Sequence, residues 1–182
     1  MIIILFGFKR CGKTYYGRLL AKRMHFTFID TDRLIEDLYF REEGLKTTCR
    51  QIHQDLGESA FRAYEQKVIN EIKHKKDAVI SVGGGAVLHE NNLLALGRIG
   101  TLVYLKASKE MIEKRILSDE LPSYLNPHEP EQSFERMYRD REPKYVQVQA
   151  REVEIDNKKD DEVLEELEEI IKQTREINHG AK

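Results

Sequence analysis

Short runs of apolar residues alternate along the chain with longer stretches in which apolar residues recur at helical spacing. The fully apolar run Ile2–Phe6 is typical of a strand buried on both faces. Similar runs predict four more strands, at Phe26–Ile29, Ala78–Val82, Thr101–Leu105 and Glu152–Ile155. Because strands and helices alternate, the pattern predicts an α/β fold in which a five-stranded parallel sheet lies between two helical layers.

The amphipathic stretches between these strands predict the helices. They are Thr14–Met24, Asp32–Phe40, Thr48–Leu56, about Glu58 to His74, a helix that ends at Leu93–Gly97, Ser108–Leu117, Glu131–Glu142, and a closing helix with Val163, Leu164, Leu167, Ile170, Ile171 and Ile177 on one face. Ser108 is a candidate N-cap. Pro130 is expected to open the helix Glu131–Glu142, and Pro143 is expected to interrupt it.

Length and charge narrow the classes of function. A chain of 182 residues fits a single domain over residues 1–182, and its formal net charge of −2 gives no global field for nucleic acid or a membrane surface. The apolar N-terminal run is too short for a signal peptide or a membrane span, and no other run approaches about 18 apolar residues. Two cysteines suit a reducing compartment. We therefore expect a cytoplasmic protein, and nothing in the sequence requires more than a monomer.

The strongest motif follows the first strand directly. Residues Gly7–Thr14 match the phosphate-binding loop G-x-x-x-x-G-K-[ST] without a gap. Its glycines let main-chain N–H groups point at phosphate oxygens, Lys13 can reach the β- and γ-phosphates, and the Thr14 hydroxyl can bind Mg²⁺. A chance glycine-rich turn is the alternative, but the required strand and helix flank the motif. The loop predicts nucleotide binding and leaves the phosphate acceptor open.

Two carboxylates, Asp30 and Asp32, end the second predicted strand. Ligands of parallel sheets bind beyond the carboxyl ends of the strands. One carboxylate near a phosphoryl group can help to hold hydrated Mg²⁺, and the other can accept a hydrogen bond from the attacking hydroxyl. The alternative is an N-cap for the following helix. The phosphate-binding loop favours the functional interpretation.

Five segments carry a family resemblance that covers nearly the whole chain. In order they are GFKRCGKT, FIDTD, GESAFRAYE, VISVGGG and DREPKY. Together they resemble the shikimate kinases, P-loop enzymes with a nucleoside-monophosphate-kinase-like fold and a mobile lid. The resemblance implies transfer of the γ-phosphate of ATP to the 3-hydroxyl of shikimate, with Mg²⁺, giving shikimate 3-phosphate and ADP in aromatic amino-acid (chorismate) biosynthesis.

The resemblance also implies roles for individual residues. Lys13 and Asp32 are the implied catalytic residues. The implied ATP contacts are Lys9, Arg10, Cys11, Gly12, Lys13, Thr14, Tyr15 and Arg115, with adenine contacts also at Asn157–Lys159. The implied metal site is Thr14, Asp30 and Ser81. The implied shikimate contacts, with substrate-binding helices at about 31–62, are Asp32, Arg62, Gly83, Gly84, Gly85 and Arg141.

Several of these residues also have plainer interpretations. Arg62 could simply pair with Glu58 at i,i+4, and Glu65 could orient Arg62. Arg141 could belong to a solvated basic helix face, and Ser81 could be structural. Three consecutive glycines are entropically costly, so we expect close approach of backbone to ligand at Gly83–Gly85. Cys11 could be a small residue that the loop tolerates.

One segment departs from the family pattern. Residues 118–130, which hold three of the four prolines, are the expected lid, where shikimate kinases usually carry an Arg-Pro pair and this chain has Leu121-Pro122. Candidate replacement cations are Lys9, Arg10, Arg136 and Arg139. The alternatives left open are another small-molecule P-loop kinase, such as one acting on gluconate, and a nucleotide-binding homologue with weakened catalysis.

Overall fold

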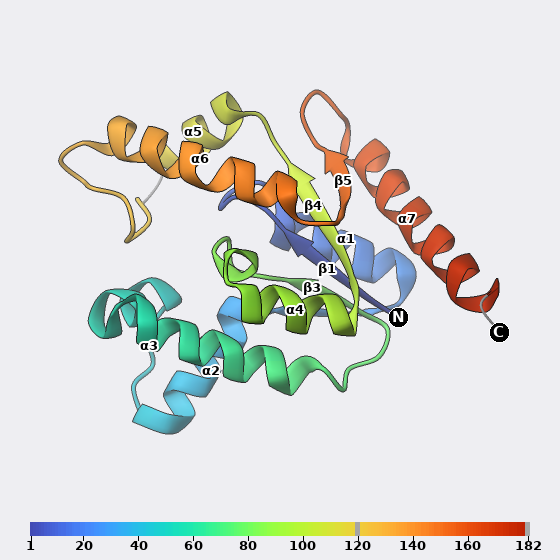
Figure 1. Ribbon diagram of the computed structural model, residues 1–182, viewed down its shortest axis with the longest axis horizontal. Helices are drawn as coiled ribbons and strands as arrows, with labels where there is room; N and C mark the ends of the chain where they lie inside the picture. Colours follow the sequence, from blue (N-terminus) through green and yellow to red (C-terminus); the bar gives the residue numbers. More distant parts are fainter. Residues whose placement is uncertain (119–120, 181–182) are drawn as a thin grey trace.

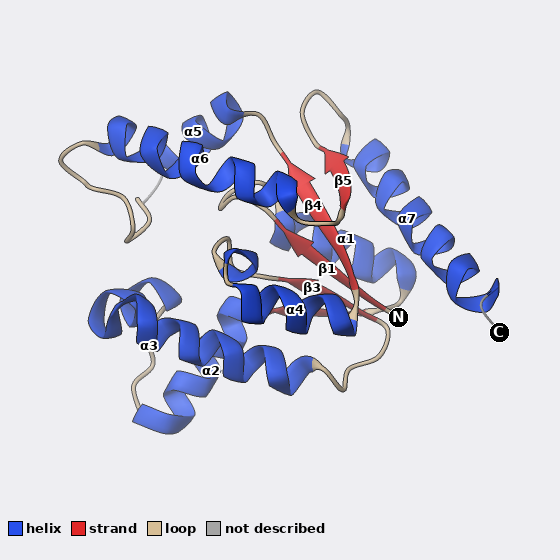
Figure 2. Ribbon diagram, viewed as in Figure 1, coloured by secondary structure: helices blue, strands red, loops and turns tan. Residues whose placement is uncertain are grey.

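A five-stranded parallel sheet forms the centre of the protein (Figures 1 and 2). The structure is a computed structural model that describes residues 1–118 and 121–180. The strands are β1 (Ile2–Phe6), β2 (Thr27–Asp30), β3 (Ala78–Ser81), β4 (Thr101–Lys106) and β5 (Arg151–Glu154), in the order β2-β3-β1-β4-β5. Every neighbouring pair is parallel, and β1 is buried along its whole length. The predicted fold class and its five strands are confirmed.

Helices cover both faces of the sheet. On one face α1 (Lys13–Met24) packs against α7 (Asp160–Gly180). Helices α4 (Glu90–Ile99) and α6 (Pro130–Gln147) lie in front of the sheet in Figure 1, with α1 behind it. The remaining elements of the carboxyl half are a 3₁₀ turn, η1 (Ala86–Leu88), and α5 (Lys109–Leu117). Within residues 1–118 and 121–180, we find no helix with the length and apolarity that a membrane crossing requires.

A separate helical lobe leaves the sheet after β2. It consists of α2 (Thr31–Glu43) and α3 (Cys49–Ile72), which pack against each other around their own small core. That core comprises Ile35, Leu38, Tyr39, Ile52, Phe61, Tyr64 and Val68. At Gly57 the backbone of α3 is not helical, with φ 77° and ψ 173°. The two helices predicted on either side of Gly57 are therefore present, and the chain changes direction between them.

Helix α6 corrects one prediction. Pro143 does not interrupt it, because the helix continues to Gln147. Proline removes one hydrogen bond from the ladder, but tertiary packing can outweigh this loss. Here Tyr145, one turn further on, is buried and its ring lies 4.8 Å from that of Phe8 and 6.1 Å from that of Phe6. The predicted N-cap is confirmed, since the Ser108 hydroxyl accepts a hydrogen bond from the N–H of Met111.

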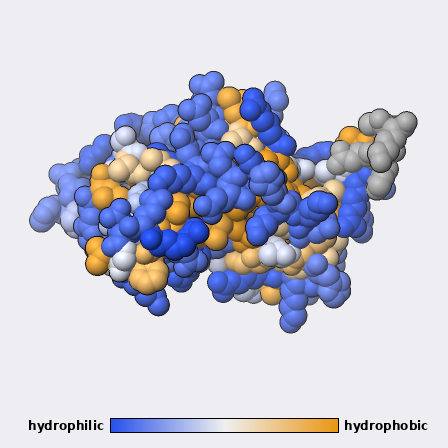
Figure 3. All heavy atoms as spheres, turned by 90° about the horizontal axis from the view of Figure 1, so that it is seen from below, coloured by the Kyte–Doolittle hydropathy of each residue, from blue (hydrophilic) through white to orange (hydrophobic). Residues whose placement is uncertain are grey.

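The face seen from below in Figure 3 is mostly hydrophilic, with apolar side chains showing between charged ones. Among the described residues, large apolar side chains exposed by more than half include Phe40, Leu45 and Leu94. They belong to α2, the α2–α3 connection and α4, outside the two hydrophobic cores. The two hydrophobic cores stabilise the fold. The candidate functional residues lie at the edge of the sheet.

Candidate active site

A cavity of about 690 Å³ opens at the carboxyl ends of β1, β2 and β3. Its walls come from the phosphate-binding loop, the α2–α3 lobe, the β3–η1 loop and the segment between α5 and α6. The residues predicted from the sequence that line it are Lys9, Arg10, Gly12, Lys13, Thr14, Tyr15, Asp30, Asp32, Arg62, Ser81, Gly83, Gly84, Gly85, Arg115 and Arg141. Residues from five separate motifs thus meet at one edge of the sheet.

The phosphate-binding loop is held open by its glycines and by its lysine. Gly7 has φ +140°, and a Cβ there would lie 2.6 Å from the carbonyl oxygen of Leu105, so no other residue fits. The Lys13 ammonium donates hydrogen bonds to the carbonyl oxygens of Gly7 (3.1 Å) and Phe8 (2.8 Å). These bonds place the ammonium in the middle of the loop, where a phosphate chain would be held.

Cys11 is the predicted loop residue that does not line the cavity. Its side chain is fully buried, and its N–H donates to the carbonyl of Phe8 at 3.2 Å. The Cys11 side chain belongs to the main hydrophobic core, so it fills space behind the loop. This geometry matches the interpretation of Cys11 as a tolerated small residue.

Three oxygen-bearing side chains meet beside the loop. The Thr14 hydroxyl donates to Asp30 Oδ2 (2.9 Å) and lies 3.5 Å from the hydroxyl of Ser81. Asp30 is also the N-cap of α2, because its Oδ1 accepts the N–H of Asp32 at 3.1 Å. The N-cap interpretation of Asp30 is therefore confirmed, and its metal role stays a prediction. Hydroxyl and carboxylate oxygens are the ligands that Mg²⁺ prefers.

This oxygen cluster would hold a metal only with the help of water or phosphate. Within the part of the chain that the structure describes, no group of three or more His, Cys, Asp or Glu side chains forms a metal cage. Mg²⁺ is usually bound by one or two protein oxygens and keeps several water ligands. The donor set of Thr14, Asp30 and Ser81 fits that mode of binding.

Asp32 stands between the loop and the helical lobe. Its side chain reaches the β3–η1 loop, where a Cβ on Gly83 would lie 3.0 Å from its Oδ1. Enclosure by the cavity walls, and then the neighbouring Asp30, raise the pKa of Asp32, while Lys13 and Lys9 oppose the rise. Burial lowers the pKa of Lys9, partly offset by Asp32. A raised pKa makes the Asp32 carboxylate a better proton acceptor.

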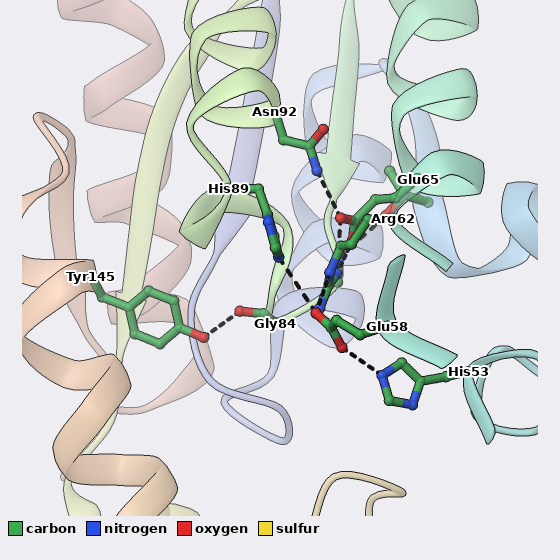
Figure 4. A network of polar contacts seen from close by, with 10 residues as sticks. His53, Glu58, Arg62, Glu65, Gly84, His89, Asn92 and Tyr145 are labelled. Carbon is green, nitrogen blue, oxygen red and sulfur yellow. Dashed lines mark hydrogen bonds and ion pairs between the residues drawn. The ribbon is translucent and has the colours of Figure 1, made fainter. Parts of the chain in front are cut away.

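Two carboxylates hold the guanidinium of Arg62 on the opposite wall (Figure 4). Its Nε donates to Glu58 Oε1 at 2.7 Å, and its Nη1 donates to both oxygens of Glu65 at 2.9 and 3.0 Å. The contacts expected at i,i+4 and i,i+3 are thus present. Glu65 is buried and also accepts a hydrogen bond from Asn92 Nδ2 at 2.7 Å. Burial raises the pKa of Glu65 to about 6, although Arg62 opposes this.

The triple glycine fits tightly between these groups. None of the three glycines, Gly83 to Gly85, has a left-handed φ, and space is the requirement at Gly85 and, less strictly, at Gly83. A Cβ on Gly84 would lie 3.4 Å from the backbone of Gly7 and Lys9, and one on Gly85 would lie 2.4 Å from Nη2 of Arg62. The hydroxyl of Tyr145 donates to the carbonyl oxygen of Gly84 (Figure 4). These neighbours are protein groups, and the close approach of this backbone to a ligand stays a prediction.

Arg141 reaches the same end of the cavity from α6. Its guanidinium lies 4.4 Å from the ring centre of Tyr124, a geometry that favours a cation–π contact. Both residues line the cavity, together with Arg62. The packing on Tyr124 fixes Arg141 in the cavity wall rather than on a solvated helix face.

The nucleotide end of the cavity differs in part from expectation. Arg115 donates to the carbonyl of Arg10 at 3.0 Å and lines the cavity, and Tyr15 donates to Asp160 at 2.5 Å. Residues 157–159 are not among the lining residues that the structure describes. The Asn157–Lys159 segment therefore lies outside the cavity as described.

The expected lid, residues 118–130, lies only partly within the described chain, because positions 119–120 fall outside it. Leu121 packs against the main hydrophobic core. Arg136 pairs with Glu129, and neither Arg136 nor Arg139 is among the described lining residues. Lys9 and Arg10 do line the cavity. Of the candidate replacements for a lid arginine, only these two are brought to the site.

Some site residues were not predicted from the sequence. They are Arg50, His53 and Glu58 of α3, Asn92 of α4, and Pro122, Ser123 and Tyr124 of the α5–α6 segment. Glu58 was considered only as an ion-pair partner. His53 and Glu58 are five residues apart, a spacing that does not make neighbours on a regular helix. They meet at 2.7 Å because Gly57 breaks the helix between them.

Comparisons with known proteins agree with this geometry. The sequence model of the family described as shikimate kinase matches residues 9–172. A shikimate kinase of Caldanaerobacter subterraneus subsp. tengcongensis is 33% identical over 165 residues, covering 91% of this chain and 92% of that protein. One of Thermodesulfovibrio yellowstonii is 32% identical over 178 residues, covering 98% and 97%.

A solved structure gives the same result. The shikimate kinase from Acinetobacter baumannii, in complex with shikimate, is 29% identical to this chain with a TM-score of 0.82. The alignment covers 95% of this chain and 93% of that one. Sequence and fold therefore agree over nearly the whole length, and the chain belongs to the shikimate kinase family, whose members are ATP-dependent phosphotransferases.

Proposed function

We propose that this protein transfers the γ-phosphate of ATP to the 3-hydroxyl of shikimate, giving shikimate 3-phosphate and ADP. One observation carries the proposal. A single cavity has a phosphate-binding lysine with an oxygen cluster at one end, and two arginines for an acidic acceptor at the other, with Asp32 between them. The relative from Acinetobacter baumannii, which was solved with shikimate, supports the acceptor.

The phosphate-binding loop would hold the nucleotide. Lys13 now donates to two loop carbonyls, and phosphate oxygens would be stronger acceptors for the same ammonium. The N-terminus of α1, which begins at Lys13, adds its positive end. Lys13 would stabilise the charge that develops on the transferring phosphoryl group, which is the main task of a protein in this chemistry.

Thr14, Asp30 and Ser81 would hold Mg²⁺ with water and phosphate oxygens as the remaining ligands. When bound, Mg²⁺ would neutralise phosphate charge and orient the γ-phosphate. The hydrogen bond from Thr14 to Asp30 keeps the two oxygens together in its absence. The protein's own contribution is thus a preformed pair of oxygens beside the loop lysine.

The acceptor would lie between Asp32 and the two arginines. Arg62 and Arg141 offer planar donors that suit a carboxylate, and each is held by packing or ion pairs. Asp32 would orient the attacking hydroxyl and accept its proton, a role that its raised pKa favours. Positioning of donor and acceptor in one cavity supplies much of the rate.

Lys9 and Arg10 are proposed to replace the missing lid arginine. Both line the cavity beside Lys13, whereas Leu121 packs against the core. A cation near the transferring phosphoryl group contributes strongly to the rate in related chemistry. The presence of Lys13, Thr14, Asp30 and Asp32 in one cavity favours an active enzyme over a homologue that only binds nucleotide.

ADP release with a panel of acceptors tests the proposal. Shikimate should support ADP release and gluconate should not. Asp32→Asn should lower kcat by about a hundredfold or more, and Arg62→Ala should raise the KM for shikimate. Arg139→Ala, outside the described cavity lining, is the matched control. Turnover with gluconate alone, or full activity in both site variants, would refute the assignment.

The cytoplasmic location, the monomeric state and the mobile lid stay predictions.

A further inference from the structure

A chain of polar contacts links Arg62 to the segment between α5 and α6. Arg62 Nε donates to Glu58 Oε1, and Glu58 Oε2 lies 2.7 Å from Nε2 of His53. On the far side of the ring, Nδ1 of His53 lies 3.2 Å from the hydroxyl of Ser123. Figure 4 shows His53, Glu58 and Arg62 in a row. The catalytic roles proposed above do not use His53 or Ser123.

The roles of the two ring nitrogens follow from Glu58. Arg62 Nε lies 2.7 Å from Glu58 Oε1, and this ion pair keeps Glu58 ionised. An ionised carboxylate can only accept hydrogen bonds, so Nε2 of His53 must donate. Nδ1 then meets the Ser123 hydroxyl, which can donate to a neutral ring or accept from a charged one. The contact with Ser123 is available in either protonation state of His53.

Glu58 is the more exposed of the two carboxylates that hold Arg62. The Glu58 side chain is 55% exposed, whereas that of Glu65 is 1% exposed, and solvent screens an exposed ion pair. An exposed carboxylate holds a guanidinium less firmly than a buried one, so a second contact on Glu58 helps to keep Arg62 Nε in place. His53 is 21% exposed, and its ring packs against Phe61 at 5.4 Å with an interplanar angle of 73°. The ring thus provides a rigid second anchor for Glu58.

We propose that His53 is a positioning residue for the acceptor site, held by Ser123 and acting on Arg62 through Glu58. The inference rests on the proposed function, because it assigns Arg62 to the carboxylate of the acceptor. It adds that the α5–α6 segment contributes to the acceptor site through Ser123, whose hydroxyl fixes the orientation of the imidazole. His89, 3.5 Å from Glu58 Oε1, is a longer contact on the same carboxylate and is 41% exposed.

Two conservative substitutions separate the two ring nitrogens. In His53→Gln the amide nitrogen can occupy the place of Nε2 and keep the bond to Glu58. In His53→Asn the amide can replace only Nδ1 and loses Glu58. We expect His53→Asn to raise the KM for shikimate about fivefold, the size of one lost hydrogen bond, with the KM for ATP unchanged. His53→Gln should stay within about twofold of the wild type. His128→Gln, an exposed histidine in the same segment, is the matched control.

We would measure steady-state kinetics with each substrate varied, which gives the two KM values. The melting temperature of each variant shows whether it is folded. Equal KM values for shikimate in His53→Asn and His53→Gln would overturn the inference. An equal rise in the KM for shikimate and the KM for ATP in His53→Asn would also overturn it. If His53→Asn does not fold, Ser123→Ala carries the test. It should raise the KM for shikimate about twofold to threefold, with rescue by Ser123→Thr, and no change would overturn the inference. Absence of shikimate turnover in the wild type would instead refute the proposed function, and the inference with it.

Discussion

Gly85→Ala should damage the acceptor site and leave the fold intact. Gly85 has φ −91° and ψ −10°, which alanine adopts without strain. A Cβ there would lie 2.4, 3.0 and 3.1 Å from Nη2, Cζ and Nη1 of Arg62. Normal contact distances begin near 3.5 Å, so the guanidinium must retreat by about 1 Å.

That retreat has a calculable effect because Arg62 is already held on two sides. Its bonds to Glu58 and Glu65 are 2.7 to 3.0 Å long, and a shift of about 1 Å would stretch at least one of them beyond hydrogen-bonding distance. The guanidinium of Arg62 would also lose its alignment with the carboxylate of the acceptor. A charged hydrogen bond contributes about 1.5–3 kcal/mol, so the KM for shikimate should rise about tenfold to a hundredfold.

ADP release measured against shikimate and against ATP checks this expectation. The KM for ATP should stay within about twofold, because the displaced group lies at the acceptor end. Gly97→Ala is the matched control, since its Cβ would meet only Leu102 Cδ1 at 4.0 Å inside α4, and alanine is favoured there by up to about 1 kcal/mol. An unchanged KM for shikimate in a folded Gly85→Ala protein would refute the placement of Arg62 at the acceptor.

Three further variants test the other parts of the site. The pKa of Glu65 is raised from 4.5 to about 6 in the folded protein, so ionising Glu65 lowers the stability by about 2 kcal/mol. This loss of stability is absent below pH 4.5, where Glu65 is protonated in both states, and complete above pH 6. Urea unfolding should therefore show that the free energy of unfolding of Glu65→Gln, relative to that of the wild type, is about 2 kcal/mol higher at pH 7.5 than at pH 4. The same difference between the two proteins at both pH values would contradict a buried charge at Glu65. Lys13→Met should lower kcat by at least about a hundredfold with the melting temperature kept, and a small loss would remove Lys13 from catalysis. Thr14→Val should raise the Mg²⁺ concentration that gives half-maximal rate by about tenfold. Tyr16→Phe is the control, because the Tyr16 hydroxyl bonds Asp160 and Tyr16 is not among the described lining residues. An unchanged Mg²⁺ requirement in Thr14→Val would exclude Thr14 as a ligand.

The fold could be predicted from the sequence because its signals are local. The apolar run of β1 and the glycine pattern of the phosphate-binding loop each determine one element without knowledge of the rest. Pro143 shows the limit of such signals. A proline lowers the stability of a helix locally, but burial of Tyr145 beyond it depends on Phe6 and Phe8, more than a hundred residues away. Tertiary packing decided the boundary of α6, and no local pattern reports it.

The site could be predicted only as far as motifs mark it. Asp30, Asp32, Arg62 and the triple glycine stand in segments that resemble a family, whereas Asn92 stands in an ordinary helix. Asn92 is buried and donates to Glu65 across a sequence separation of 27 residues. His53 was missed for a different reason, because its approach to Glu58 requires the left-handed Gly57 between them. Such contacts depend on the direction of the chain, which composition and spacing do not give.

The triple glycine sets the distance between the two halves of the proposed reaction. Each glycine gives room to a different neighbour: Gly83 to Asp32, Gly84 to the phosphate-binding loop, and Gly85 to Arg62. Tyr145 ties the middle one to α6, the helix that also carries Arg141. A side chain at Gly83 would press on Asp32 and one at Gly85 would displace Arg62. Transfer between bound groups falls steeply with misplacement of about 1 Å. The entropic cost of three consecutive glycines is therefore offset by what they accommodate, because Asp32, the phosphate-binding loop and Arg62 all approach one short segment of backbone.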